Sequence, residues 1–175
     1  MSSSASAPVS PKTIILAFDG TSNKFGKHKT NLLRLYGLLD KTNRDKQVQY
    51  YQPGVGTYLA EGTAWSPTIK ALRETLDSVF AWYLDIHILD GYRFLMKNYK
   101  PGDRVCMFGF SRGAYTARCL AGMLNKVGLL PPDNDQMVAS AYERYLDTSP
   151  DGKELAKDFK EQLGQPCPIE FLGLW

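Results

Sequence analysis

Histidine and cysteine are scarce in this sequence, which limits the chemistry that it can support. Its 175 residues include two histidines, and its three cysteines are odd in number and lack the spacing of metal ligands. We therefore predict no metal site, and free thiols of the kind kept in a reducing compartment. The three are Cys106, Cys119 and Cys167.

Long apolar runs and a strong net charge are also absent. No stretch approaches the ~18 consecutive apolar residues that a membrane-spanning helix needs. A net charge of +3, with no basic block interleaved with aromatic residues, is too weak to indicate nucleic-acid binding. Residues 1–12 are rich in Ser, Ala and Pro and lack the apolar core of a secretory signal. We predict a disordered tail there, and a cytoplasmic or otherwise intracellular protein.

Two phosphate-related motifs, a phosphate-binding loop and an aspartyl-phosphate phosphatase motif, are incomplete in this sequence. The segment from Gly20 to Lys27 is close to a phosphate-binding loop, but its second glycine comes one residue late and His28 stands where Ser or Thr should be. The Asp19-Gly20-Thr21 segment is close to an aspartyl-phosphate phosphatase motif, but Thr21 replaces the second acid that protonates a leaving group. We therefore expect no cofactor.

What the sequence does contain is an alternation of strands and helices. A chain of 175 residues with 43% hydrophobic content can bury a substantial core. Buried strands are expected at Thr13–Phe18, Val105–Phe108 and Pro168–Trp175, and a further strand is expected at Gln47–Gln52. Helices are expected at about 30–41, 68–98 with a break near Gly91, 114–124, 136–146 and 153–163. This order predicts an α/β fold with a mostly parallel, doubly wound sheet and helices on both faces.

The most informative segment is Gly109-Phe110-Ser111-Arg112-Gly113. It follows an apolar strand and precedes a helix with small residues, which is the context of a nucleophile elbow. Such a turn raises the Ser111 hydroxyl above the sheet edge, and side chains at positions 109 and 113 would collide, which accounts for the two glycines. The alternative is a tight turn in which Ser111 only caps the helix.

A serine nucleophile needs a base, and none stands in the expected place. On this kind of sheet the acid and then the histidine follow the serine, whereas His28 and His87 both precede Ser111. His87 lies in the middle of a helix among aromatic residues, so we expect a structural role. His28 lies in the loop at the edge of the site, and a rearranged triad that uses it is the alternative.

A resemblance to a known family rests on motifs along the whole chain. They are Phe18-Asp19-Gly20-Thr21, Thr30-Asn31, Pro53-Gly54-Val55-Gly56-Thr57, Tyr92-Arg93-Phe94-Leu95 and the ten residues from Gly109 to Arg118. In this order they resemble the α/β-hydrolase domain of the type VI secretion phospholipase effector-like proteins of bacteria and fungi. The resemblance covers about Thr13 to Trp175, and it implies hydrolysis of phospholipids or related acyl esters by a Ser-Asp-His triad.

The resemblance also implies roles for residues around the serine. Ser111 is the implied nucleophile, and Arg112 supplies one backbone N–H of the implied oxyanion hole. We expect the second N–H from the loop after the first strand, because both segments follow parallel strands. That loop holds Gly20, Thr21, Ser22 and Asn23. We expect the Arg112 guanidinium to form a salt bridge to an acid such as Asp19, at the edge of the site.

In this family, a strand that resembles Phe171-Leu172-Gly173-Leu174-Trp175 continues directly into the triad aspartate, and the histidine comes later. We therefore expect residues 13–175 to be the N-terminal part of an α/β-hydrolase-like domain, truncated at its C-terminus and inactive alone. An oligomer or a partner is expected to cover the exposed edge. Two functions remain open: a serine ester hydrolase acting on lipid or small acyl-ester substrates, and a non-catalytic α/β binding module that lacks the acid and the base.

Overall fold

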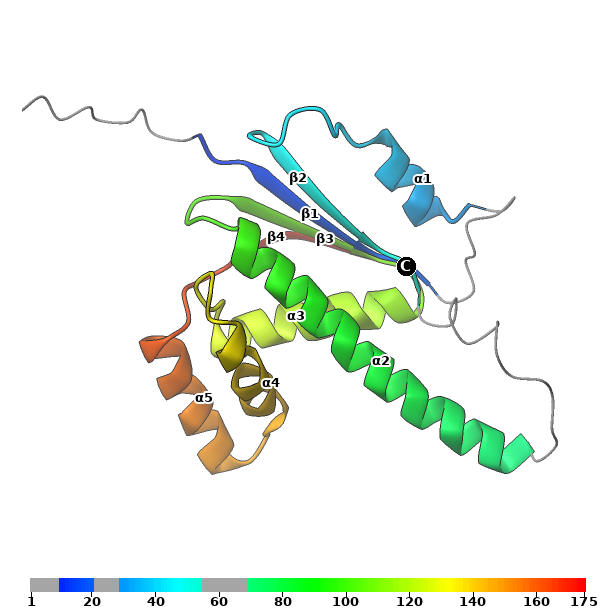
Figure 1. The fold of residues 1–175 in the computed structure, drawn as a ribbon, viewed down its shortest axis with the longest axis vertical. Helices are drawn as coiled ribbons and strands as arrows, with labels where there is room; N and C mark the ends of the chain where they lie inside the picture. Colours follow the sequence, from blue (N-terminus) through cyan, green and yellow to red (C-terminus); the bar gives the residue numbers. More distant parts are fainter. Residues whose placement is uncertain (1–9, 21–28, 55–68) are drawn as a thin grey trace, which may run out of the picture.

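The computed structural model describes residues 10–20, 29–54 and 69–175, with side chains in the long helix described from Leu84 onward. It shows an α/β protein whose four parallel strands lie in the order β2-β1-β3-β4 (Figure 1). The strands are β1 (Thr13–Phe18), β2 (Gln47–Gln52), β3 (Arg104–Gly109) and β4 (Ile169–Leu174). The helices are α1 (Asn31–Leu38), α2 (Ile69–Asn98), α3 (Arg112–Val127), the 3-10 turn η2 (Asp135–Met137), α4 (Val138–Leu146) and α5 (Pro150–Gln162).

The chain reverses its direction of travel across the sheet once. It passes from β1 to β2 on one side, then crosses back to place β3 on the other side of β1 and β4 beyond it. Helix α1 lies over one face, whereas α2 and α3 cover the other, with α4 and α5 packed on α3 (Figure 1). This arrangement places the topological switch point, where open α/β sheets bind ligands, between the carboxyl ends of β1 and β3.

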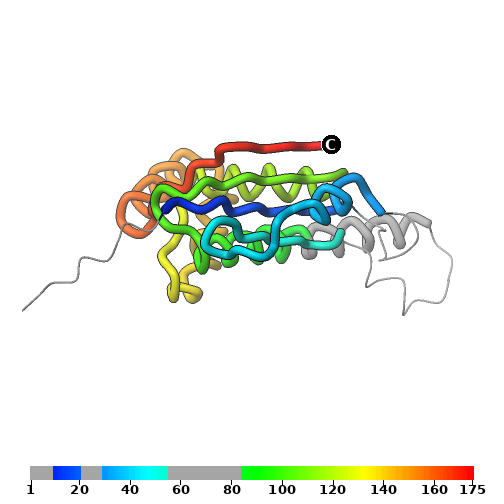
Figure 2. The backbone as a smooth tube through the Cα atoms, turned by 90° about the horizontal axis from the view of Figure 1, so that it is seen from above, coloured from blue at the N-terminus to red at the C-terminus, as the bar shows by residue number. Residues whose placement is uncertain are grey.

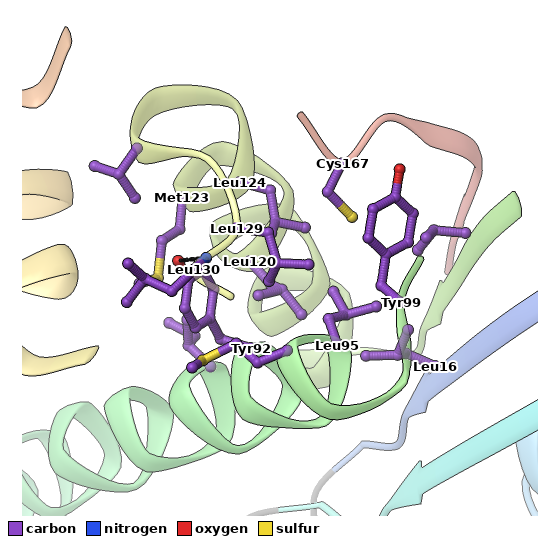
Figure 3. Packing of buried hydrophobic residues seen from close by; sticks show 14 of the residues in the cluster. Leu16, Tyr92, Leu95, Tyr99, Leu120, Met123, Leu124, Leu129, Leu130 and Cys167 are labelled. Carbon is purple, nitrogen blue, oxygen red and sulfur yellow. Dashed lines mark hydrogen bonds between the residues drawn. The ribbon is translucent and has the colours of Figure 1, made fainter. Parts of the chain in front are cut away.

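The main core lies between the sheet and the α2–α3 layer. Alternate residues of β1 and β3 point into it, as expected for strands with one face under helices. At its centre the fully buried Tyr92 of α2 donates its hydroxyl to the Gly128 carbonyl at 2.9 Å. The same hydroxyl accepts the Leu130 N–H at 2.9 Å (Figure 3). These two bonds attach α2 to the chain that leaves α3.

The expected break in the long helix is absent, since α2 is continuous from Ile69 to Asn98. Gly91 instead marks a close approach between layers. A Cβ at that position would lie 2.8 Å from the Phe18 ring and 2.9 Å from the Leu120 side chain. The glycine is therefore explained by packing of α2 against the sheet and α3.

Two expected boundaries also shift. Helix α1 ends at Leu38, because the extended Leu39 follows it and caps the last turn. Lys12, which the sequence placed in a disordered tail, belongs to the fold. Its backbone N–H and its ammonium group donate to the two carboxylate oxygens of Asp103 at 2.9 and 2.7 Å. Residues 1–9 of the expected tail lie outside the part of the chain described here.

Strand β4 is present where expected but is not buried. It pairs with β3 on one side only and forms one edge of the sheet among the described residues (red in Figure 2). Phe171 and Trp175 are 52% and 60% exposed, although their rings lie close to that of Phe108. These rings lie on the face of Phe108, away from the core between the sheet and α2–α3, so their burial requires a covering layer on that face, which the apolar sequence alone does not reveal.

Candidate functional site

The candidate site residues Asp19 and Ser111 lie just after the carboxyl ends of β1 and β3. Backbone hydrogen bonds continue beyond the paired segments there: Asp19 N–H donates to the Gln52 carbonyl at 2.9 Å, and Phe110 N–H donates to the Phe18 carbonyl at 3.0 Å. The turns after β1 and β3 are thereby held side by side at the switch point. This is the edge of the sheet at which the sequence places its candidate site residues.

Ser111 occupies a strained turn between β3 and α3. Its φ of 54° and ψ of −123° fall in a region that non-glycine residues rarely adopt. Although Ser111 stands at the N-cap position of α3, its hydroxyl makes no capping hydrogen bond and the side chain is exposed. The alternative in which this hydroxyl serves to cap the helix is therefore not realised.

The two glycines of the turn occupy positions without room for a side chain. A Cβ on Gly109 would lie 2.5 Å from the Cα of Ala114, and one on Gly113 would lie 2.5 Å from the carbonyl carbon of Phe18. The first clash would arise within the turn, and the second where α3 rests on β1. The glycines therefore permit both the tight turn and the close packing of α3 against β1.

The far side of the turn is held by the end of β4. Ser111 N–H donates to the Trp175 carbonyl at 2.7 Å, and Trp175 N–H donates to the Gly109 carbonyl at 3.0 Å. The sequence indicates only a strand at Trp175, and no local motif predicts its backbone contact with the serine. The serine is thus flanked by the ends of β1 and β4.

Asp19 is buried at 3% exposure directly after β1. Its Oδ1 accepts the Gly20 N–H at 2.7 Å, and its Oδ2 accepts the hydroxyls of Thr30 and Tyr51, each at 2.7 Å. The salt bridge expected between Asp19 and Arg112 is not formed, because no ion pair joins these two described residues. The carboxylate oxygens of Asp19 instead accept hydrogen bonds from two hydroxyl groups and one backbone N–H.

Gly20 lies against the elbow. A Cβ built on it would lie 2.8 Å from the Phe110 ring and 3.1 Å from Ser111 Cβ. Its N–H, one of the expected oxyanion donors, is already donated to Asp19. The other expected donors of this loop, Thr21, Ser22 and Asn23, and the site-edge His28 lie outside the described residues.

No base is identified next to the serine. Among residues 10–20, 29–54 and 84–175, whose side chains are described, none forms a hydrogen bond with Ser111 Oγ. His87 is half-buried in α2, and burial lowers its pKa below the ordinary value while the nearby Asp90 carboxylate opposes that shift. The described residues contain no group of three His, Cys, Asp or Glu side chains able to hold a metal ion, and their three cysteines are free.

Comparisons with known proteins identify a family and a relative of this chain. Residues 12–175 match the family model "T6SS, Phospholipase effector Tle1-like, catalytic domain". The chain belongs to this family. Its similarity to the uncharacterized protein YEL023C of Saccharomyces cerevisiae is 43% identity over 180 residues, covering 95% of this chain and 26% of the yeast protein. The chain therefore spans about a quarter of that relative's length.

No solved structure matches the Tle1-like chain. The described helices include none that is both long enough and apolar enough to cross a membrane. The family membership supports lipid hydrolysis at the level of the family, and the yeast relative carries no assigned activity.

Proposed function

We propose that this Tle1-like domain is a serine ester hydrolase of the α/β-hydrolase type, acting on phospholipids or related acyl esters. The family's description as a phospholipase effector catalytic domain supports the substrate class. The observation that carries the proposal is the strained, exposed Ser111 at the switch point, with φ 54° and no capping bond. A turn of this shape between a strand and a helix is the geometry that exposes a nucleophilic serine.

The proposed chemistry is acyl transfer through Ser111. Its Oγ attacks the ester carbonyl carbon, the carbon–oxygen bond to the leaving alcohol breaks, and water then hydrolyses the acyl-enzyme. The oxyanion forms near the N-terminus of α3, where Arg112 is the first helical residue. Because Gly20 N–H is donated to Asp19, the second donor is proposed within residues 21–23.

The hydroxyl proton must pass to a base during the attack. The resemblance assigns the triad acid to the position after β4, and the bond between Ser111 N–H and the Trp175 carbonyl places the end of β4 beside the serine. The base is proposed to be a histidine further along the natural chain, with His28 as the alternative.

A fluorophosphonate probe tests the nucleophile on the intact protein. The serine oxygen forms a bond to phosphorus, fluoride leaves, and only an activated serine reacts at a useful rate. We expect labelling of the wild type, none of Ser111→Ala, and wild-type labelling of Ser149→Ala. Ser149 is a matched control because it is also an exposed serine at a helix N-cap, but its hydroxyl accepts the Gly152 N–H at 3.0 Å.

Two outcomes would count against the proposal. Labelling that persists in Ser111→Ala would place the nucleophile elsewhere. A folded wild-type protein that remains unlabelled, and that hydrolyses neither short-chain nitrophenyl esters nor phospholipids, would favour the non-catalytic binding module.

A further inference from the structure

The carboxylate of Asp19 gathers donors from three different parts of the fold. They are the N–H of Gly20 in the turn after β1, the hydroxyl of Thr30 at the N-cap of α1, and the hydroxyl of Tyr51 in β2, each at 2.7 Å. At 3% exposure the group has little access to water, so these donors supply most of its solvation. Losing one of them would leave a buried polar group unsatisfied.

The backbone that Asp19 holds is in contact with the serine turn. Gly20 approaches the elbow so closely that a Cβ there would lie 3.1 Å from Ser111 Cβ. On the other side of the turn, a Cβ on Gly113 would lie 2.7 Å from the Asp19 carbonyl oxygen. The Asp19–Gly20 peptide therefore borders Ser111 directly, and its orientation is set by the Gly20 N–H that points into the carboxylate.

We propose that Asp19 is a positioning residue for the reaction at Ser111. It acts by locking the Gly20 N–H and so fixing the wall of the site on the β1 side of the serine. This inference rests on the proposed function, since it concerns the reactivity of Ser111. Asp19 touches neither the substrate nor the reacting atoms, and its effect passes through Gly20.

The buried carboxylate of Asp103 is a control that distinguishes an effect of Asp19 on the position of the serine turn from an effect on the stability of the protein. Asp103 is 8% exposed and also accepts three hydrogen bonds, from the N–H and ammonium groups of Lys12 and from the Lys100 N–H. It lies just before β3, at the opposite end of the sheet from Ser111. Asp19→Ala and Asp103→Ala should therefore both lower the stability, and only the first should lower the reactivity of the serine.

The experiment measures the maximal rate and the half-saturating concentration of fluorophosphonate labelling, per folded molecule, on the intact protein. Small displacements next to reacting groups cost up to ~100-fold in rate, so we expect a ~10-fold or larger loss of maximal rate in Asp19→Ala with little change in half-saturation. Asp19→Asn should recover part of the loss, because its amide carbonyl can still accept the Gly20 N–H. Asp103→Ala should label at the wild-type rate.

The controls distinguish this inference from the proposed function. If wild-type Ser111 is unlabelled, the proposed function fails first. If wild-type Ser111 is labelled and folded Asp19→Ala labels equally fast, or slows no more than Asp103→Ala, Asp19 is only structural and the inference is overturned.

Should Asp19→Ala not fold, Thr30 provides the second test. Thr30→Ala removes one donor to Asp19, whereas Thr30→Ser retains it together with the cap of α1. A labelling rate at least ~3-fold slower in the alanine variant and near wild type in the serine variant supports the inference. Equal rates in the two folded variants overturn it.

Discussion

Replacing Gly113 with alanine tests the closest contact on which the serine turn depends. The added methyl group would lie 2.5 Å from the carbonyl carbon of Phe18 and 2.7 Å from the carbonyl oxygen of Asp19. Both neighbours are backbone atoms at the end of a central strand, which hydrogen bonds hold on both sides. A flexible side chain could move aside, whereas this strand can yield only if α3 lifts from the sheet.

The expected loss of stability in Gly113→Ala follows from overpacking. Inserting a methyl group into a packed interior costs about 1–3 kcal/mol, and a rigid backbone neighbour favours the upper end of that range. A loss of about 3 kcal/mol corresponds to a decrease in Tm of about 6–12 °C for a chain of this size. Chemical denaturation followed by circular dichroism measures the free energy of unfolding, and a thermal scan measures Tm.

Gly37→Ala is the matched control. Gly37 lies in α1, and a Cβ there would meet no atom within 4 Å. Alanine in an open helical position should stabilise the protein by about 0.5–1 kcal/mol, because it lowers the entropy of the unfolded chain. A Gly113→Ala variant as stable as the wild type would contradict the close seat of α3 on β1, and with it the geometry of the elbow.

Two further predictions concern α2. Tyr92→Phe removes the hydroxyl that joins the Gly128 carbonyl and the Leu130 N–H. Because two buried polar groups are left unpaired, the free energy of unfolding, measured in urea, should fall by about 1–3 kcal/mol. An unchanged urea midpoint would show that these bonds contribute nothing. Burial lowers the pKa of folded His87, so below pH ~6.5 the unfolded chain binds more protons and the stability should fall. Comparing urea midpoints at pH 7.5 and 5.5 in the wild type and in His87→Gln checks this, and an equal fall in both would assign the pH dependence to other groups.

The order of strands and helices could be predicted from the sequence because each depends on neighbouring residues. The run Thr13–Phe18 is apolar and rich in β-branched residues, and it forms β1 at the predicted boundaries. The turn at Ser111 was predictable for a similar reason, since a glycine on each side of a serine directly after a strand allows few other backbone paths. In both cases the determining interactions lie within a few residues.

The partners of the site groups were decided only by the tertiary structure. Asp19 meets Thr30 and Tyr51, which are 11 and 32 positions away in the sequence, because β2 lies beside β1 and α1 begins above them. The sequence analysis expected Arg112 as the partner, yet the buried carboxylate accepts hydrogen bonds from two hydroxyl groups and the Gly20 N–H.

The exposure of β4 is a second feature that only the tertiary structure decided. Its apolar sequence indicated burial, but the rings of Phe171 and Trp175 lie on the face away from the core, and their burial requires a covering layer on that face. The sequence alone determined which segments become strands and helices and where the serine turn lies, since these follow from local backbone preferences and hydrophobic periodicity. Which residues meet across the sheet depends on strand order and helix placement, so only the tertiary structure decided the surroundings of Ser111.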